Sequence, residues 1–150
     1  MYLKMEREIK FRGYGIKGWV YGSLLKEVDI DHIDYYIVDP EDLSIKYAVD
    51  RDSVGEYTGL FDYSGEEIYE GQYLKLESGI PEFDREFCVC YDPDFCRFCL
   101  TVEDEAGSID LTKRFVKEKK LKVINDQSNF WHFAYAWKFH SDEVKTIQRI

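Results

Sequence analysis

Four cysteines within twelve residues are the side chains of this sequence best suited to chemistry: Cys88, Cys90, Cys96 and Cys99. Thiolates at such spacing bind zinc when four of them converge on one tetrahedral site. The segments 85–91 and 97–102 predict a β-hairpin around Asp92-Pro93-Asp94. Because side chains alternate between the two faces of a strand, the directions of the sulfur atoms depend on how this hairpin pairs.

Two pairing registers are open for the cysteine hairpin. With Tyr91 opposite Cys96, the other three cysteines share one face of the sheet and Cys96 points away. With Tyr91 opposite Phe95, Cys99 is the one that points away. Neither register brings four thiolates together without a bulge. We therefore expect reduced, metal-free cysteines that act as small core residues.

Signatures of catalysis are scarce elsewhere in the sequence. Asp29, Asp31 and His32 offer cation ligands, but the glycine and the final glutamate of a calcium loop are missing, which favours a solvated loop. There is no glycine-rich phosphate loop, nucleophile elbow or His-Glu metal helix, and the three histidines are scattered. We expect a protein without cofactor or enzymatic activity. A hydrolase that binds a metal through dispersed carboxylates is the remaining enzymatic alternative.

A basic segment between residues 113 and 122 is the candidate for nucleic-acid binding. If it is helical, Lys113, Lys117 and Lys120 line one side, a geometry that can follow phosphates. The alternative is a solvated helix face that balances the acidic middle of the chain, and the pI of about 4.8 favours it. The basic residues are Lys113, Arg114, Lys117, Lys119, Lys120 and Lys122.

Aromatic residues alternate along the segment 130–140, so that one face of a strand there would present five rings. Such a face most often forms the wall of a hydrophobic core. The alternative is an exposed platform for subunit contact or for stacking on bases or sugars. The rings belong to Trp131, Phe133, Tyr135, Trp137 and Phe139.

Length, charge and hydropathy point to one domain over residues 1–150, with possible lobes at 1–65 and 66–150. The net charge of −10 is unevenly distributed: residues 1–26 carry +4, residues 27–110 carry −19 and residues 111–150 carry +5. Packing of the termini on the middle would balance these charges internally, and contact between subunits would balance them externally. The absence of a long apolar run predicts no membrane span and a cytoplasmic location.

Short β-prone segments outnumber helical ones. Alternating patterns predict strands at 7–13, 17–25, 33–38, 85–91, 97–102 and 121–124. Asp110 precedes a helix expected at 111–120, and Pro40 opens a second, shorter one capped by Asp39. Many short strands favour a mainly β fold: a small SH3-like or related barrel over the second half, an N-terminal β-rich lobe and one or two short helices.

The segment 54–72 has the turn chemistry of a β-hairpin. Asp62 and Gly65 stand at the first and last positions of a type I turn, Gly59 suggests a bulge, and Gly71 reverses the chain. The segment reads VGEYTGLFDYSGEEIYEGQ and resembles the YopX-like family, whose usual pattern is VGQYTGLKDKNGKEIYEGD. The opening REIKFRG at residues 7–13 resembles the same family. Gln72 stands where the pattern has aspartate, and the residues after 124 depart from it.

The resemblance implies a small phage or prophage protein from a largely uncharacterised family. We expect a non-enzymatic accessory protein in the host cell that acts by binding another macromolecule, either a host or a phage protein. The alternative is a nucleic-acid-binding module that uses the basic segment. We also expect a homo-oligomer formed through exposed β edges or through the ring-rich strand.

Overall fold

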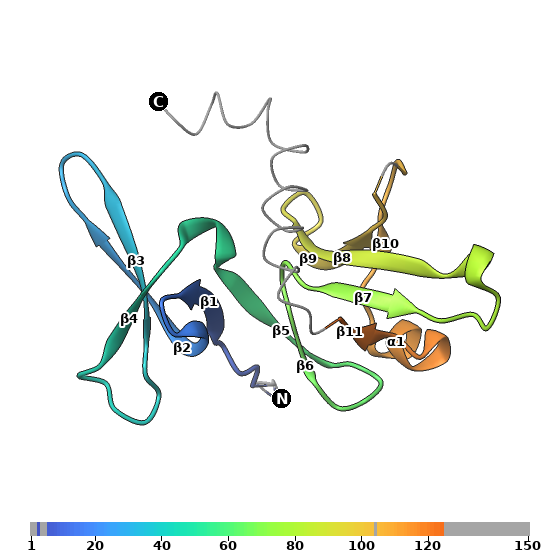
Figure 1. The fold of residues 1–150 in the computed structure, drawn as a ribbon, viewed down its shortest axis with the longest axis horizontal. Coiled ribbons are helices and arrows are strands. Elements are labelled where there is room, and N and C mark those ends of the chain that lie inside the picture. Colours follow the sequence, from blue (N-terminus) through green and yellow to red (C-terminus); the bar gives the residue numbers. More distant parts are fainter. Residues whose placement is uncertain (1–2, 4–5, 104, 125–150) are drawn as a thin grey trace.

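The computed structural model describes residue 3 and residues 6–103 and 105–124 of the chain. These residues form two antiparallel sheets that lie side by side (Figure 1). The mainly β class is therefore confirmed. Among the described residues, no helix is both long and apolar enough to cross a membrane.

The first sheet has six strands in the order β4-β3-β2-β1-β5-β6. Its strands are β1 Phe11–Gly15, β2 Gly18–Val28, β3 Ile33–Val38, β4 Lys46–Val49, β5 Gly55–Phe61 and β6 Glu67–Tyr69. The short 3₁₀ helix η1, Arg51–Ser53, connects β4 to β5. The YopX-like segment therefore forms one hairpin, β5–β6, at one edge of this sheet.

The first sheet curls until β4 lies beside β1. The backbone N–H of Asp50 donates a hydrogen bond to the carbonyl oxygen of Tyr14 at 2.8 Å. A Cβ atom at Gly15 would collide with the backbone carbonyl of Ala48, and one at Gly13 would press on the side chain of Val49. The two glycines of β1 thus permit the close approach of the two strands.

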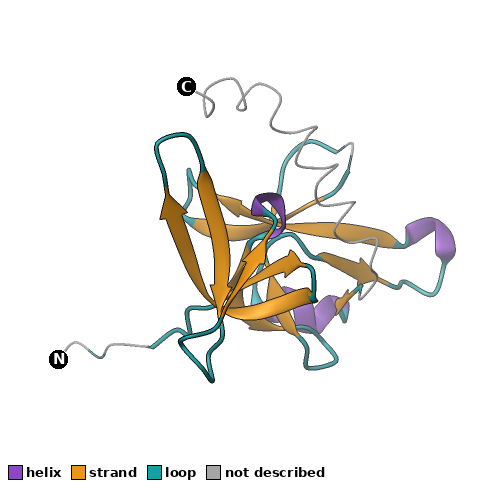
Figure 2. Cartoon of the chain, turned by 60° about the vertical axis from the view of Figure 1, so that its left-hand side comes forward, coloured by secondary structure: helices purple, strands orange, loops and turns teal. Residues whose placement is uncertain are grey.

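The second sheet has five strands in the order β10-β9-β8-β7-β11. Its strands are β7 Tyr73–Leu76, β8 Arg85–Asp92, β9 Arg97–Thr101, β10 Ile109–Asp110 and β11 Lys122–Val123. The 3₁₀ helix η2, Pro81–Phe83, lies between β7 and β8, and the helix α1, Lys113–Lys119, lies between β10 and β11. Figure 2 shows the strands and the helices in separate colours.

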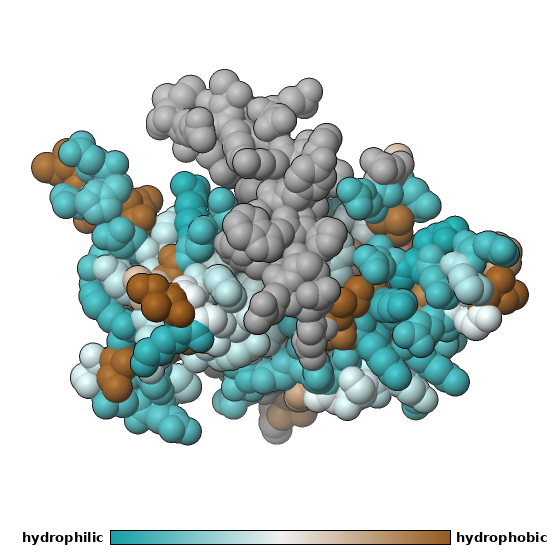
Figure 3. Space-filling model, in the orientation of Figure 1, coloured by the Kyte–Doolittle hydropathy of each residue, from teal (hydrophilic) through white to brown (hydrophobic). Residues whose placement is uncertain are grey.

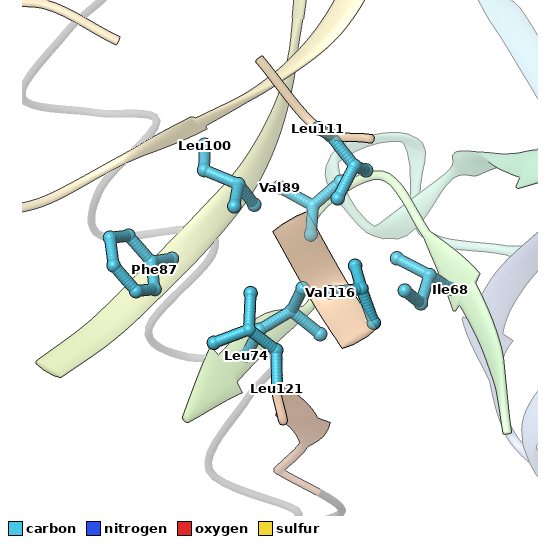
Figure 4. Close-up of a cluster of buried hydrophobic side chains, with 8 residues drawn as sticks. All are labelled: Ile68, Leu74, Phe87, Val89, Leu100, Leu111, Val116 and Leu121. Carbon is cyan, nitrogen blue, oxygen red and sulfur yellow. The ribbon is translucent and has the colours of Figure 1, made fainter. Parts of the chain in front are cut away.

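The hydrophobic core joins α1 to one face of the second sheet and to β6. Figure 4 shows its eight buried side chains: Ile68, Leu74, Phe87, Val89, Leu100, Leu111, Val116 and Leu121. Thr112 caps α1, because its hydroxyl accepts the N–H of Phe115 at 3.0 Å. Val116 on α1 and Ile68 on β6 thereby fix the YopX-like hairpin to the second half of the chain.

The barrel expected for the second half is not closed. Its outer strands, β10 and β11, have two residues each and do not pair with each other in the described part of the chain. The sheet is therefore open at both ends, and α1 covers its core face instead. The main curl of the fold lies in the N-terminal sheet.

The short helix predicted at Pro40 is wrong. Asp39 accepts the N–H of Glu41 at 2.8 Å, and Asp42 accepts the N–H of Ser44 at 3.0 Å. Each aspartate thus closes a local turn of the kind that competes with helix formation. The chain then enters β4, a strand that the sequence did not predict.

Candidate functional site

The most prominent surface feature is the hairpin formed by β2 and β3. Six residue pairs from Ser23↔Val38 to Val28↔Ile33 hold its strands together. Its end projects from the body of the protein as the light-blue hairpin of Figure 1, and Figure 2 shows the same projection from another side. We call residues 27–34 at this end the β2–β3 tip.

The β2–β3 tip exposes apolar side chains to solvent. Ile30 is 97% exposed and Val28 is 74% exposed, and Ile33 is exposed as well. Hydrophobic residues gather at the end of this hairpin in Figure 3, among hydrophilic ones. Val28 and Ile33 pair across the two strands, and Ile30 lies in the turn between them, which is closed by the hydrogen bond from the N–H of Asp29 to the carbonyl oxygen of His32 at 2.9 Å.

Carboxylates surround the apolar side chains of the tip. Glu27 pairs with Lys46 of β4, and His32 lies 3.2 Å from Asp34. Asp29 and Asp31 are exposed. The solvated loop predicted for Asp29, Asp31 and His32 is confirmed as the exposed turn that joins β2 to β3. Across the described ranges, no group of three or more His, Cys, Asp or Glu residues is placed to hold a metal ion.

The cysteine hairpin pairs in a register that the sequence reading did not consider. Tyr91 lies opposite Phe98 and Cys90 lies opposite Cys99, so both predicted registers are wrong. Asp92 pairs with Arg97, so the four residues 93–96 form the turn, one position later than in the register with Tyr91 opposite Cys96. The shift from Cys96 to Phe98 is two residues, so Cys88, Cys90 and Cys99 still share one face of the sheet. Cys96 lies exposed in the turn at a φ of 51°.

A cluster of polar and titratable groups lies around Cys90. The Cys88 and Cys90 sulfur atoms are 3.7 Å apart, and the Thr101 hydroxyl lies 3.5 Å from the Cys90 sulfur. The hydrogen bond between Cys90 and Cys88 lowers the pKa of Cys90 to about 7, although burial opposes the shift. Burial raises the pKa of the nearby Glu70 carboxyl to about 7, and the charge of Glu56 adds to this shift.

The basic segment forms α1 and the residues that follow it. All six basic side chains predicted for this surface are exposed. Lys113 and Lys117 lie within the helix, whereas Lys120 is its left-handed C-terminal cap at a φ of 51°. Arg114 pairs with Glu118 at 2.8 Å, one turn away. The five rings predicted between Trp131 and Phe139 lie outside the described residues.

Arg12 is a buried charge that the sequence reading missed. Its guanidinium lies 3.7 Å from the ring centroid of Trp19, and only 4% of the residue is exposed. Burial lowers its pKa to about 10, so it keeps its charge at neutral pH. The alternation in residues 7–13 predicted a half-buried strand, of which only Phe11, Arg12 and Gly13 lie in β1, and it did not indicate that Arg12 is buried. Arg12 is therefore a charged side chain inside the first sheet, stacked on the ring of Trp19.

A comparison with protein-family models agrees with the sequence motif of residues 54–72. No curated protein matches the chain. A family model described as YopX protein matches residues 10–133, which contain nearly all of both sheets and the β5–β6 hairpin. That match covers more than half of the sequence. The chain therefore belongs to the YopX protein family.

Proposed function

We propose that this YopX-family member is a non-enzymatic accessory protein that binds a partner protein through the β2–β3 tip. The observation that carries the proposal is the exposure of Ile30 and Val28 at the end of a projecting hairpin. Apolar side chains held on a rigid element lose little conformational freedom on binding, which favours affinity. In this proposal the protein is encoded by a phage or prophage and acts in the host cytoplasm.

The charges of the tip indicate which partner would fit. Residues 27–34 contain four carboxylates, at Glu27, Asp29, Asp31 and Asp34, and no lysine or arginine. An apolar pocket bordered by basic side chains would receive Ile30 and would attract the surrounding carboxylates. Such complementarity raises the association rate more than the final affinity.

Affinity capture with matched variants tests the proposal. A partner is first captured from host lysate, then purified and titrated against each variant. Val28→Ser with Ile30→Ser should weaken binding by about tenfold or more, as loss of an apolar anchor does. Ile16→Ser is the matched control, because Ile16 is fully exposed in the β1–β2 turn at the other end of β2. Equal binding by the tip variant and the wild type would contradict the proposal.

The exposure of all six basic side chains around α1 favours a second candidate, nucleic-acid binding. Binding to DNA or RNA by this surface should weaken steeply between about 50 mM and 200 mM salt. Reversal of charge at Lys113, Lys117 and Lys119 should abolish it. Lys26→Glu, on the distant β2, is the control. Salt-independent or undetectable binding would reject this candidate.

A further inference from the structure

Three thiols lie on the face of the second sheet that is turned away from its hydrophobic core. Val89 of β8 and Leu100 of β9 pair with each other and belong to the core. Cys88, Cys90 and Cys99 alternate with them and therefore point to the opposite face. Cys88 and Cys99 are buried, and Cys90 is partly exposed. A reagent in solution thus reaches Cys90 before the other two.

The surroundings of Cys90 favour its thiolate. While Cys90 is protonated, its thiol donates to the Cys88 sulfur at 3.7 Å, and the Thr101 hydroxyl lies 3.5 Å from the Cys90 sulfur. Once Cys90 ionises, the Cys88 thiol and the Thr101 hydroxyl are the two groups within reach to donate to its thiolate. The same contact raises the pKa of Cys88, since the shared proton stays on Cys88 when Cys90 ionises. Burial raises the pKa of Cys99. One of the three thiols is therefore activated, and two are held protonated.

We propose that Cys90 is a modification site for small-molecule disulfides and that Cys88 is its resolving thiol. The Cys90 thiolate attacks one sulfur of the reagent, forms a mixed disulfide and expels one thiolate. Once Cys90 is capped, its thiolate no longer raises the pKa of Cys88, and Cys88 loses its proton to solvent and attacks the Cys90 sulfur. The second reagent thiolate leaves and a Cys88–Cys90 disulfide remains. Two protein thiols are oxidised, and the reagent disulfide is reduced to two thiols.

Strand geometry makes this modification reversible. Residues two apart on one strand have Cα atoms about 6.6 Å apart. Disulfides accept Cα separations of roughly 4.4–6.8 Å but Cβ separations of only about 3.5–4.5 Å, so a Cys88–Cys90 bridge forms only with local bending of the strand and is strained. Strained bridges are more easily reduced than relaxed ones. A small thiol should therefore restore both cysteines.

Several titratable groups face this pair and shape its pH dependence. Cys99 lies opposite Cys90 on β9, and Glu70 acts on both Cys88 and Cys90 from the segment after β6. Tyr73 of β7 hydrogen-bonds Cys88. Negative charge on Glu70 opposes the thiolate of Cys90, whereas the hydrogen bond between Cys90 and Cys88 favours it. Together these groups lower the pKa of Cys90, which favours its thiolate.

Alkylation of the full chain tests which thiol reacts. A Cys96→Ser background removes the exposed thiol of the turn. Pulses of iodoacetamide followed by peptide mass spectrometry should show Cys90 reacting about tenfold faster than Cys88 and Cys99 at pH 7. The Cys90 rate should reach half its maximum near pH 7. Equal rates for the three thiols, or a Cys90 midpoint near the ordinary thiol value of about 8.5, would overturn the proposal.

Glutathione disulfide, used as the probe, tests the resolving step. In the Cys96→Ser background it should give a Cys88–Cys90 disulfide, and in Cys88→Ser it should stop at a mixed disulfide on Cys90. Thr101→Val keeps all three thiols and should move the alkylation midpoint upward, and Cys99→Ser should leave it unchanged. A Cys90–Cys99 bridge, or a Cys88→Ser protein that collects no mixed disulfide, would contradict the assignment. Circular dichroism shows that each variant is folded.

Discussion

The Asp62 carboxylate accepts a hydrogen bond from the backbone N–H of Val123 at 2.8 Å, across 61 positions of sequence. Its other oxygen accepts the N–H and the hydroxyl of Ser64 and the N–H of Glu66, each at 2.8 Å. The aspartate of the YopX-like motif thus shapes the β5–β6 turn and fastens it to β11. Asp62 is 6% exposed, so these bonds are shielded from water.

Asp62→Asn should destabilise the fold. An amide can keep one acceptor oxygen but places a donor where a second acceptor is needed, so Val123 or the turn loses its partner. A buried group left without its hydrogen bond costs about 1–3 kcal/mol. Urea unfolding of the full chain measures the loss. Asp31→Asn, at the exposed β2–β3 tip, is the control and should leave the free energy of unfolding unchanged. Equal stability of the two variants would contradict this role.

The same carboxylate should make the fold sensitive to acid. Burial by itself raises the pKa of Asp62, but the hydrogen bonds from Val123, Glu66 and Ser64 together hold it below its usual range. The folded pKa therefore lies below the unfolded value of about 3.9. The stability that Asp62 contributes is present above the unfolded value and is lost as pH falls through the folded one. Between about pH 5 and about pH 2, the range in which such a carboxyl titrates, the free energy of unfolding should fall less in Asp62→Asn than in the wild type.

Glu70 should have the opposite effect on stability. Burial and the charge of Glu56 raise its folded pKa to about 7, above the unfolded value. The protonated carboxyl is therefore favoured by folding, and this contribution is lost as pH rises toward the folded pKa. Glu70→Gln should stabilise the protein at pH 8 by on the order of 1–3 kcal/mol and have little effect near pH 4. Urea unfolding at both pH values measures this difference, and equal effects would reject it.

Gly15→Ala should open the curl of the first sheet. The new Cβ atom would collide with the backbone carbonyl oxygen of Ala48. A backbone atom cannot turn aside as the end of a flexible side chain can. Overpacking of this kind costs about 1–3 kcal/mol. Ile16→Ala is the neighbouring control, since that side chain is exposed. Thermal unfolding compares the two, and an unchanged midpoint for Gly15→Ala would show that β4 does not press on β1.

Local turn chemistry explains which elements the sequence could predict. The β5–β6 hairpin was predicted because Asp62 bonds residues close in sequence, and Gly65 adopts the left-handed φ of 93° that this turn requires. The bulge at Gly59 is confirmed by the break in pairing between Tyr57 and Phe61. The partner of Asp62 on β11 was not predictable, because no local pattern reports a contact made 61 residues away.

The candidate sites were predicted less completely than the fold. Of the two registers left open, only the one with Tyr91 opposite Cys96 gave the right face for Cys88, Cys90 and Cys99, since an error of two residues in register preserves the face and an error of three does not. The β2–β3 tip was read as a loop because its carboxylates alternate with Val28 and Ile30. That alternation is also a strand signal, and it could have revealed the hairpin if the apolar residues had been weighted as heavily as the charges.

The protein should self-associate, and the contributions of its charged segments and of its ring-rich segment 130–140 can be separated by experiment. The basic ends of the sequence and its acidic middle supply complementary patches between identical subunits, and a closed dimer is the commonest result of a self-complementary surface. Light scattering at low and high salt should show a dimer at low salt. Dissociation at high salt alone would assign the contact to the charges, because salt screens exposed charges. Trp131→Ala or Trp137→Ala should weaken a salt-resistant dimer without unfolding the chain. A monomer under both conditions would reject self-association, and unfolding of either tryptophan variant would place the rings in the core.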